Sequence, residues 1–510
     1  MDNRIQLSRR RLALRAALVL GGALATPPAL ADDLRDALAA AYRGNPTLEA
    51  ARAQQRAVDE SVPIARAQGL PSLSGNASYT EILKASANNF GIGPDRVLDV
   101  AATASYPVYS GGAVRNAINA AQTRVRAGQS DLRGVETGLF AQTTAAYMDV
   151  IQNEAIVGLN RNNVQVLEVN LSATRDRFEI GDLTRTDVAQ SQARLAQARS
   201  DLRSAEANLA ASRETYIRFV GKPASNLQPP PPLPGMPGSP DEAVTMALDN
   251  NPDLRAERER SKASRFDSKA AGAGRLPKIS VFVTGDRTDY LGSYNQSPFN
   301  PLATTRPLSA QAGVRATIPL FQGGLPAAQQ RQAQARESAQ LETEIATERE
   351  VIAVVRTYYQ QWKASQEIIV SSQAAVDAAA LGLEGVRAEN SVGNRTILDI
   401  LNAEQELLNA QTVLVRARRN EYVAGFNLIA AMGRATAADL ALDAGPFYDP
   451  DANYRRVRGM IFDWEKDPRP IARATRTVDT PAQTGAISDA AAAALRPAGM
   501  QTSPTGTGGK

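Results

Sequence analysis

The feature that most constrains the fold is an internal duplication. The run Asn-Pro-x-Leu at 45–48 recurs 206 residues later at 251–254, and Pro-x-x-x-Gly-Gly at 107–112 recurs 212 residues later at 319–324. Three further positions match with the same offset of 212: Gly181 with Gly393, Asp187 with Asp399, and Gly221 with Gly433. Matches in constant order predict two similar structural units, with six extra residues in the second between 277 and 319.

The duplication divides the chain into segments. We expect a first repeat at 32–228, a Pro-rich linker at 229–240 with seven prolines, and a second repeat at 241–445. A C-terminal segment at 446–465 is expected beside the middle, or equator, of the molecule. Residues 466–510 are rich in Ala, Pro, Thr and Gly, and this composition predicts a disordered tail.

Residues 1–31 have the pattern of a secretory signal peptide. Arg9-Arg10-Arg11 precede an apolar run at 16–25, and Ala29-Leu30-Ala31 form a small-x-small cleavage site. A twin-arginine route through Ser8-Arg9-Arg10 stays open as an alternative. This segment holds five arginines and one aspartate, so the remaining chain has 57 − 5 = 52 basic and 53 − 1 = 52 acidic residues. The basic pI is therefore no indication of nucleic-acid binding.

Long helices are expected where proline is missing. There is none from 108 to 222 and none from 327 to 445, and proline breaks helix interiors. Helices over 113–180 and 325–392 would each be roughly 100 Å long. Shorter helices at 34–68 and 183–220 could stack end to end beside the first. Those at 241–274 and 395–432 could do the same beside the second, because polar, Ala-rich helices need lateral partners.

Four segments alternate apolar or small residues with polar ones, as β-strands do: 72–86, 96–109, 278–290 and 308–321. About ten residues is the length of a strand that crosses a bilayer in a tilted barrel. A soluble hairpin with one wet face fits the alternation equally well. If the strands do span a membrane, four cannot close a barrel, so several chains must share one.

The composition excludes much of enzyme chemistry. His and Cys are both 0, so no imidazole base, thiolate nucleophile, His/Cys zinc site or disulfide is possible. No Lys-Ser/Thr follows the Gly-Gly pairs, which argues against phosphate loops. We expect no catalytic residue, no cofactor and no metal.

The full set of features resembles the TolC family of outer-membrane channels. The residues that carry the resemblance are the duplicated Asn-Pro-x-Leu and Pro-x-x-x-Gly-Gly motifs and the run Ser-Val-Gly-Asn-Arg-Thr-Ile-Leu-Asp at 391–399. It covers roughly 32–445. It implies an α+β, mainly α fold: long antiparallel coiled-coil helices form an α-barrel, and four strands per chain join a twelve-stranded barrel in outer-membrane lipid. The implied assembly is a homotrimer that works with a periplasmic adaptor and an inner-membrane pump of the ABC or RND type, and does no chemistry itself.

The resemblance also implies a periplasmic gate. Arg395 matches the arginine that ties the inner to the outer coiled coil, and Thr186 and Asp187 match its partners. Asp399 matches the first of two aspartate rings at the entrance, whereas the second ring position is Asn402. Asn390 stands where the family has a tyrosine. From the residues alone, Asp187 and Asp399 fit helix caps as well.

Two hypotheses of function follow. The first is a passive exit duct for either a secreted protein or small toxic molecules, and the sequence does not choose between these cargoes. The second, from a different class, is a soluble periplasmic coiled-coil adaptor or scaffold.

Overall fold

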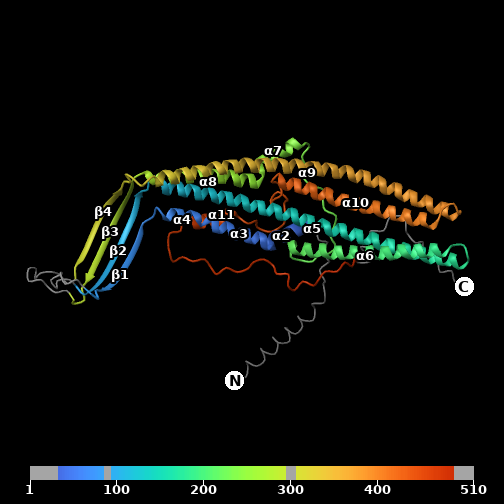
Figure 1. The fold of residues 1–510 in the computed structure, drawn as a ribbon, viewed down its shortest axis with the longest axis horizontal. Helices are drawn as coiled ribbons and strands as arrows, with labels where there is room; N and C mark the ends of the chain where they lie inside the picture. The colour runs from blue at the N-terminus through green and yellow to red at the C-terminus, as the bar shows by residue number, and fades with distance from the viewer. Residues whose placement is uncertain (1–32, 85–93, 294–305, 488–510) are drawn as a thin grey trace, which may run out of the picture.

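The computed structural model describes residues 33–84, 94–293 and 306–487. The expected signal peptide at 1–31 lies outside these ranges. The molecule is long and narrow, with a small sheet at one end and paired helices over the rest of its length (Figure 1). The turns α5–α6 and α9–α10 lie together at the end opposite the sheet, and we call that end the tip.

Both copies have the same order of elements. The first has α2 (Leu34–Gly44), α3 (Pro46–Asp59), α4 (Ser61–Ala67), β1 (Ser72–Glu81), β2 (Arg96–Tyr109), α5 (Ala113–Glu179) and α6 (Arg185–Val220). The second has α7 (Pro240–Asn250), α8 (Pro252–Gly272), the 3-10 turn η2 (Ala273–Arg275), β3 (Lys278–Asp289), β4 (Leu308–Thr317), α9 (Leu325–Ser391) and α10 (Ile397–Ala431). The short helix α11 (Pro450–Val457) follows.

The expected stacking is present, but two of the short segments that were expected as single helices are divided. The segment expected as one helix over 241–274 is α7, α8 and the turn η2. Beside α5, the short helices α3 and α4 run toward the sheet and α6 runs toward the tip; α8 and α10 take the same places beside α9 (Figure 1). The segment expected as one helix over 34–68 is three helices. The Asn45-Pro46 step separates α2 from α3, because Pro46 lacks an N–H and fits the first turn of a new helix.

The joints between stacked helices are made by the asparagines of the duplicated motif. The Asn45 side chain accepts a hydrogen bond from the Thr47 N–H at 2.8 Å and donates to the Phe219 carbonyl, near the end of α6, at 3.0 Å. Asn251 does the same in the second copy: it accepts from Leu254 N–H at 3.1 Å and donates to the Ala431 carbonyl at 2.9 Å. Each buried asparagine therefore caps one helix and ties it to the end of another.

The sheet has the order β1-β2-β3-β4, with all neighbours antiparallel. All four strands were expected, but β1 and β4 end earlier than predicted, at Glu81 and Thr317. Pro319 follows closely after β4, and proline cannot donate to a ladder. The register places apolar side chains of all four strands on one face: Leu73, Ala77, Tyr79, Leu98, Val100, Ala104, Tyr106, Val281, Val283, Ala312 and Val314. Polar pairs such as Thr103–Thr284 and Asp99–Thr288 bond on the other face.

The main core lies at the equator, where both copies and the linker meet. Phe140, Tyr147 and Tyr216 are fully buried there. Three tyrosine hydroxyls donate to carbonyls of the linker region: Tyr147 to Gln228 at 2.6 Å, Tyr359 to Gly238 at 3.1 Å, and Tyr422 to Pro231 at 3.1 Å. A Pro-rich segment offers few N–H donors, so side chains of α5, α9 and α10 satisfy its carbonyls instead.

The segment after α11 differs in part from the expected disordered tail. Residues 466–487 have no helix or strand, but 475–487 lie against the helices and run along α6 (Figure 1). The Arg213 guanidinium donates to the carbonyls of Thr484 and Ala486 at 2.6 and 2.8 Å, and Ile487 is buried in the main core. We call residues 475–487 the strap. Residues 488–510 lie outside the described part of the chain.

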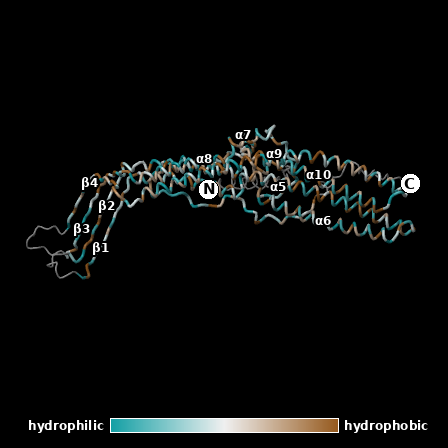
Figure 2. Tube along the Cα trace, turned by 45° about the horizontal axis from the view of Figure 1, so that its top comes forward, coloured by the Kyte–Doolittle hydropathy of each residue, from teal (hydrophilic) through white to brown (hydrophobic). Residues whose placement is uncertain are grey.

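Hydrophilic and hydrophobic residues alternate along the helices (Figure 2). Among the described residues, no helix is both long enough and apolar enough to cross a bilayer. The same residues contain no cluster of carboxylates able to hold a metal ion.

Candidate functional site

The two hairpin turns at the tip have the same geometry. Gly181 and Gly393 have φ of 83° and 86°, the left-handed region that glycine adopts without strain. The Asp182 N–H donates to the Arg177 carbonyl, and the Asn394 N–H donates to the Glu389 carbonyl, both at 2.9 Å. The duplication therefore repeats a complete helix-ending turn at the tip.

The helix that follows each turn begins with a capping box. Thr184 and Asp187 bond reciprocally at the start of α6, and Thr396 and Asp399 do so at the start of α10. The Thr184 hydroxyl and N–H hold the pKa of Asp187 below its usual range, and the Thr396 N–H and hydroxyl lower the pKa of Asp399. Both carboxylates are therefore charged at neutral pH.

Arg395 bonds within its own hairpin. Its Nε donates to Glu389 Oε2 at 2.7 Å, and its carbonyl accepts from Asn390 Nδ2 at 2.6 Å. Within the described part of a single chain, Arg395 is thus paired with Glu389 and not with Asp187. Thr186 is exposed beside Asp187. Arg395, Thr186 and Asp187 all lie at the tip. Each of the hydrogen bonds given above, however, joins residues of the same hairpin.

The links between hairpins lie slightly farther from the tip. Arg194 of α6 donates to Asn402 Oδ1 of α10 at 2.8 Å. Glu404, two residues farther along α10, is 6% exposed and accepts from Asn170 of α5 at 2.9 and 3.0 Å and from Arg387 of α9 at 3.0 Å. The bonds from Arg194 and Asn170 join the α5–α6 hairpin to the α9–α10 hairpin, and the bond from Arg387 holds α9 to α10.

Sequence reasoning missed Glu404, although a signal was present. Ile400, Leu401 and Leu408 are buried on the same stripe of α10, and a glutamate inside an apolar stripe must find polar partners. Leu401 also packs with leucines of α5 and α6 in a small separate cluster. Directly beside Glu404, a groove of about 330 Å³ runs between α5 and the α9–α10 pair.

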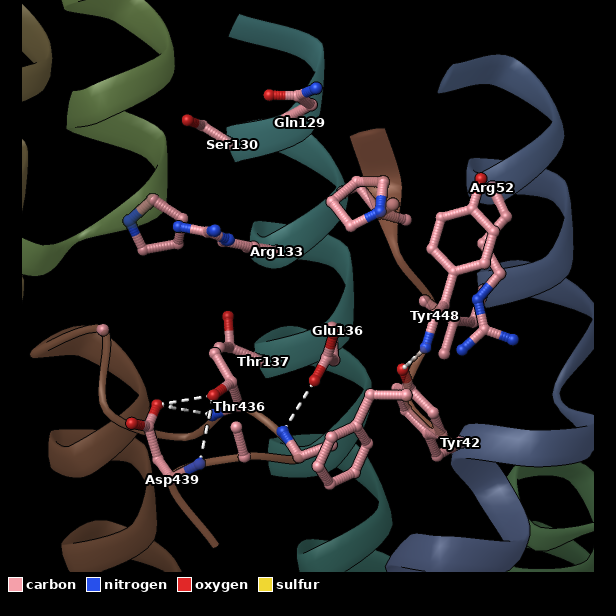
Figure 3. A pocket seen from close by; sticks show the side chains of 18 of the residues that line it. Tyr42, Arg52, Gln129, Ser130, Arg133, Glu136, Thr137, Thr436, Asp439 and Tyr448 are labelled. Carbon is pink, nitrogen blue, oxygen red and sulfur yellow. Dashed lines mark hydrogen bonds between the residues drawn. The ribbon is translucent and has the colours of Figure 1, made fainter. Parts of the chain in front are cut away.

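A second cavity, of about 340 Å³, lies at the equator (Figure 3). It is lined by α3, α5, the start of α8 and residues 433–450. The guanidinium of Arg52 lies 4.5 Å from the ring centre of Tyr42 and 5.1 Å from that of Tyr448, and the Tyr448 N–H donates to the Tyr42 hydroxyl at 2.9 Å. These contacts fasten the segment after α10 to α2 and α3.

Glu136 of α5 provides the other anchor of this segment. It accepts from the Ala437 N–H at 2.6 Å (Figure 3). Burial raises the pKa of Glu136, and the bond from Ala437 offsets only part of that effect. These contacts all belong to packing of the chain on itself, so we assign this cavity a structural role.

The fold and the tip together define a class of protein. A four-stranded sheet has one face that is apolar except near its loop end, where Arg287 and Asp289 of β3 lie. It extends into helical hairpins roughly 100 Å long. This is the architecture of a subunit of an outer-membrane channel with a large periplasmic part. The family model described as outer membrane efflux protein matches residues 37–222 and 243–434. The chain belongs to the outer membrane efflux protein family. It is not an enzyme, because proteins of this family are export channels. The hypothesis of a soluble adaptor is not supported.

Similar proteins with known names support this family assignment. The chain is 31% identical over 460 residues to the outer membrane efflux protein BepC of Brucella suis, covering 89% of this chain and 96% of the relative. It is 24% identical to the outer membrane protein TolC of Escherichia coli, covering 80% and 84%. Identity to the alkaline protease secretion protein AprF of Pseudomonas aeruginosa is 26%, covering 62% and 66%.

Solved structures share the fold. The outer membrane protein VceC of Vibrio cholerae superposes with a TM-score of 0.67 at 21% identity, covering 78% of this chain and 96% of the other. CusC, described as forming a transmembrane channel, superposes with a TM-score of 0.68 at 16% identity, covering 79% and 92%. The chain is thus an outer-membrane channel protein for type I secretion or drug efflux, in a family that works with inner-membrane pumps and adaptors.

Proposed function

We propose that the chain assembles as a homotrimer in which three copies share one twelve-stranded barrel and one helical tunnel. The observation that carries this proposal is the open sheet. β1 and β4 are its two edges, and the apolar face spans all four strands. Unpaired edges are not tolerated in lipid, so β1 of one copy must pair with β4 of another, and three copies give the twelve strands that the family resemblance implies.

The mass of the purified protein in detergent tests this assembly. We expect three copies in the unheated sample and a single chain after heating in SDS. A stable monomer or dimer that conducts ions would contradict the trimer.

In this proposal, cargo enters at the tip. An inner-membrane pump of the ABC or RND type and a periplasmic adaptor deliver the cargo to the tip. The cargo then leaves through the barrel without being released into the periplasm. The names of the relatives include both efflux and protease secretion, and we propose that the partner pump selects the cargo.

The tip is the proposed gate. Threefold symmetry would turn one Asp399 into three facing carboxylates, which repel one another and concentrate cations. Asn402 would form a second, uncharged ring. Arg395, with Thr186 and Asp187 at the neighbouring turn, would restrain the hairpins around the entrance. Support comes from the position of all five residues at one end of the molecule, and from the Arg194–Asn402 bond between hairpins.

A substitution that removes only the charge of Asp399 distinguishes its proposed role in the gate from its role as a helix cap. In Asp399→Asn the side-chain oxygen still accepts from Thr396, so the capping box persists while the charge is lost. We expect cation selectivity in planar bilayers to fall. The matched control is Asp187→Asn, which makes the same change in the other capping box. Unchanged selectivity in Asp399→Asn would show that Asp399 only caps α10.

The proposed restraint of the tip hairpins by Arg395 is tested with a second substitution. Arg395→Ser removes the bond to Glu389 and any bond to a neighbouring copy, and we expect the conductance of the resting channel to rise. Arg177→Ser, which removes the ion pair with Asp182 at the other tip turn, is the control and should conduct like wild type. If Arg395→Ser also conducts like wild type, the restraint lies elsewhere.

A further inference from the structure

An exposed aromatic turn lies where the helices meet the sheet. Phe462 is 77% exposed and Trp464 is 90% exposed, and Ile461 beside them is exposed as well. The chain has two tryptophans, and the other, Trp362, is only 8% exposed. A large aromatic side chain left in water forgoes the free energy of burial, so a surface that presents two of them calls for a partner. We call residues 460–467 the aromatic turn.

The structure fixes the aromatic turn at the sheet end of the helical part. Ile64 of α4, Leu70 just after that helix, and all residues of the aromatic turn except Trp464 line a shared open cavity of about 450 Å³. Arg66 donates to the Arg458 carbonyl at 3.0 Å, and Arg456 pairs with Asp467 at 2.8 Å. The turn is thus tied to the helix that immediately precedes β1.

The distance to the membrane strands is short. Leu70 stands two residues before β1, and Leu73 is the first residue of that strand on the apolar face of the sheet. An extended chain covers about 3.5 Å per residue, so Leu70 lies roughly 10 Å or less from Leu73. Leu70 lines the same open cavity as Phe462, so the aromatic turn lies near the start of the apolar face of the sheet.

The chemistry of the aromatic turn suits a phospholipid surface. Tryptophan is favoured at the level of lipid headgroups, because its ring is apolar and its N–H can bond to water or headgroups. Phenylalanine adds apolar surface that can be buried among the acyl chains. The exposed cations Lys466 and Arg469 lie among the carboxylates Asp463, Glu465 and Asp467. The charges therefore do not favour anionic lipid, and the two aromatic rings carry the argument. Trp362, by contrast, packs in the core and donates to Glu421 at 3.1 Å.

We infer that the aromatic turn is an interfacial anchor that inserts Phe462 and Trp464 into the periplasmic leaflet of the outer membrane beside the strands. The inference rests on the membrane placement of the sheet and adds a second contact with lipid, outside the sheet. Its consequence is mechanical: the anchor holds the α4 end of the helical part at a fixed depth, while the tip is free to move.

Tryptophan fluorescence tests the anchor directly. Trp362→Phe leaves Trp464 as the one tryptophan of the chain. We would reconstitute the full-length protein into vesicles of phosphatidylcholine and phosphatidylglycerol, with and without bromine atoms on the acyl carbons nearest the headgroup. We expect bromolipid to quench Trp464 at least about twofold and the vesicle to shield it from aqueous iodide. If Trp362→Phe perturbs packing, the difference between wild type and Trp464→Phe gives the same signal.

Two positions calibrate the result in a Trp362→Phe, Trp464→Phe background. Val283→Trp lies on the apolar face of the sheet between Ala104 and Ala312, so bromolipid should quench it. Val478 is an exposed residue of the strap. It lies at the equator, because the nearby Thr475 approaches Gly44 at the end of α2 and Gly221 at the end of α6. Iodide should quench Val478→Trp, and bromolipid should not.

Each quenching result either supports or contradicts the anchor. Quenching of Trp464 by bromolipid supports the anchor. Quenching by iodide alone overturns it, and so does protection from both quenchers, which would mean that a neighbouring copy covers the turn. If Val283→Trp is also insensitive to bromolipid, the membrane placement of the sheet fails together with the anchor. If Val283→Trp is quenched and Trp464 is not, only the anchor fails.

Discussion

Asn45 and Asn251 have the same role in the two copies. A helix that ends inside the molecule leaves carbonyls without partners, and the next helix begins with free N–H groups. One asparagine side chain supplies both an acceptor and a donor, so it satisfies one group of each kind at a joint where two helices meet. Pro46 and Pro252 follow directly, because proline is pre-organised for the first turn. The hydrogen-bonding needs at the place where two helices meet explain why the Asn-Pro pair is the clearest sign of the duplication.

The first prediction concerns this joint. Asn251→Ala removes the cap of α8 and the bond to Ala431, and the two losses together cost about 2 kcal/mol per chain. The midpoint of thermal dissociation in detergent should fall. Asn409→Ala, at an exposed position inside α10, is the control and should leave the midpoint unchanged. An equal midpoint for Asn251→Ala would show that the joint is held by packing alone.

The second prediction concerns Glu136. Burial raises its pKa in the folded chain above its ordinary value of 4.5. Below pH 4.5 the group is protonated in both folded and unfolded states and costs nothing. As the pH rises from the unfolded pKa through the raised folded pKa, the folded state loses stability relative to the unfolded state. The loss is about 1.4 kcal/mol for each pH unit that separates the two pKa values.

Glu136→Gln cannot ionise, and its side-chain oxygen can still accept from Ala437. The difference in thermal midpoint between Glu136→Gln and wild type should therefore grow in favour of the variant between pH 4.5 and pH 7. Glu342→Gln, at an exposed position of α9, should show no such growth. The same difference at both pH values would contradict the effect of burial.

At the scale of elements, helices and strands were largely predictable because their signals are local. The proline-free stretches predicted α5 and α9 to within a residue or two, and the alternation predicted four strands. The break between α2 and α3 depended on Pro46, which stood in the motif but was not used as a break. The second break, at Glu60, lies just before Pro63, which cannot donate a helical hydrogen bond and was not used either. Glu404 could not be assigned in full, because its partners Asn170 and Arg387 are distant in sequence and only the folded hairpins bring them together.

The third prediction concerns Glu404 and its two donors, which we call the Glu404 node. Glu404→Ala leaves the half-buried Asn170 without its acceptor, while the Arg387 side chain, 43% exposed, turns to water. The cost is on the order of 1–2 kcal/mol per chain. Because these bonds join α10 to α5 and α9, the hairpins should separate more readily, and the resting conductance in planar bilayers should rise. Glu404→Gln, which keeps one acceptor oxygen, should have a smaller effect.

Glu406→Ala serves as the control for the node, because Glu406 is exposed on the same helix. The thermal midpoint of each variant should be measured beside its conductance. If Glu404→Ala lowers the midpoint but conducts like wild type, the node supports the fold and takes no part in restraining the tip.

At the scale of the whole molecule, the two copies are joined by segments outside the repeats. The linker accepts hydrogen bonds from tyrosines of α5, α9 and α10, and the residues after α10 close the equator against α2, α3 and α5. The strap then continues along α6. Composition predicted a disordered tail there, because the strap has few apolar residues. Its contacts use backbone carbonyls, which composition does not reveal.

The last prediction concerns the strap. Truncation after Arg473 removes the carbonyls of Thr484 and Ala486, which leaves two donated bonds of Arg213 unmade, although its ion pair with Glu154 at 2.8 Å remains. It also removes Ile487 from the core and the Gln483 N–H bond to Glu214. Burying an isoleucine is worth about 1.5–3 kcal/mol, and each lost bond adds about 1 kcal/mol. We expect the thermal midpoint to fall clearly in this truncation and to stay at the wild-type value in a chain truncated after Ile487. Equal midpoints for the two truncations would mean that residues 474–487 add nothing to stability and that the strap is only laid on the surface of α6.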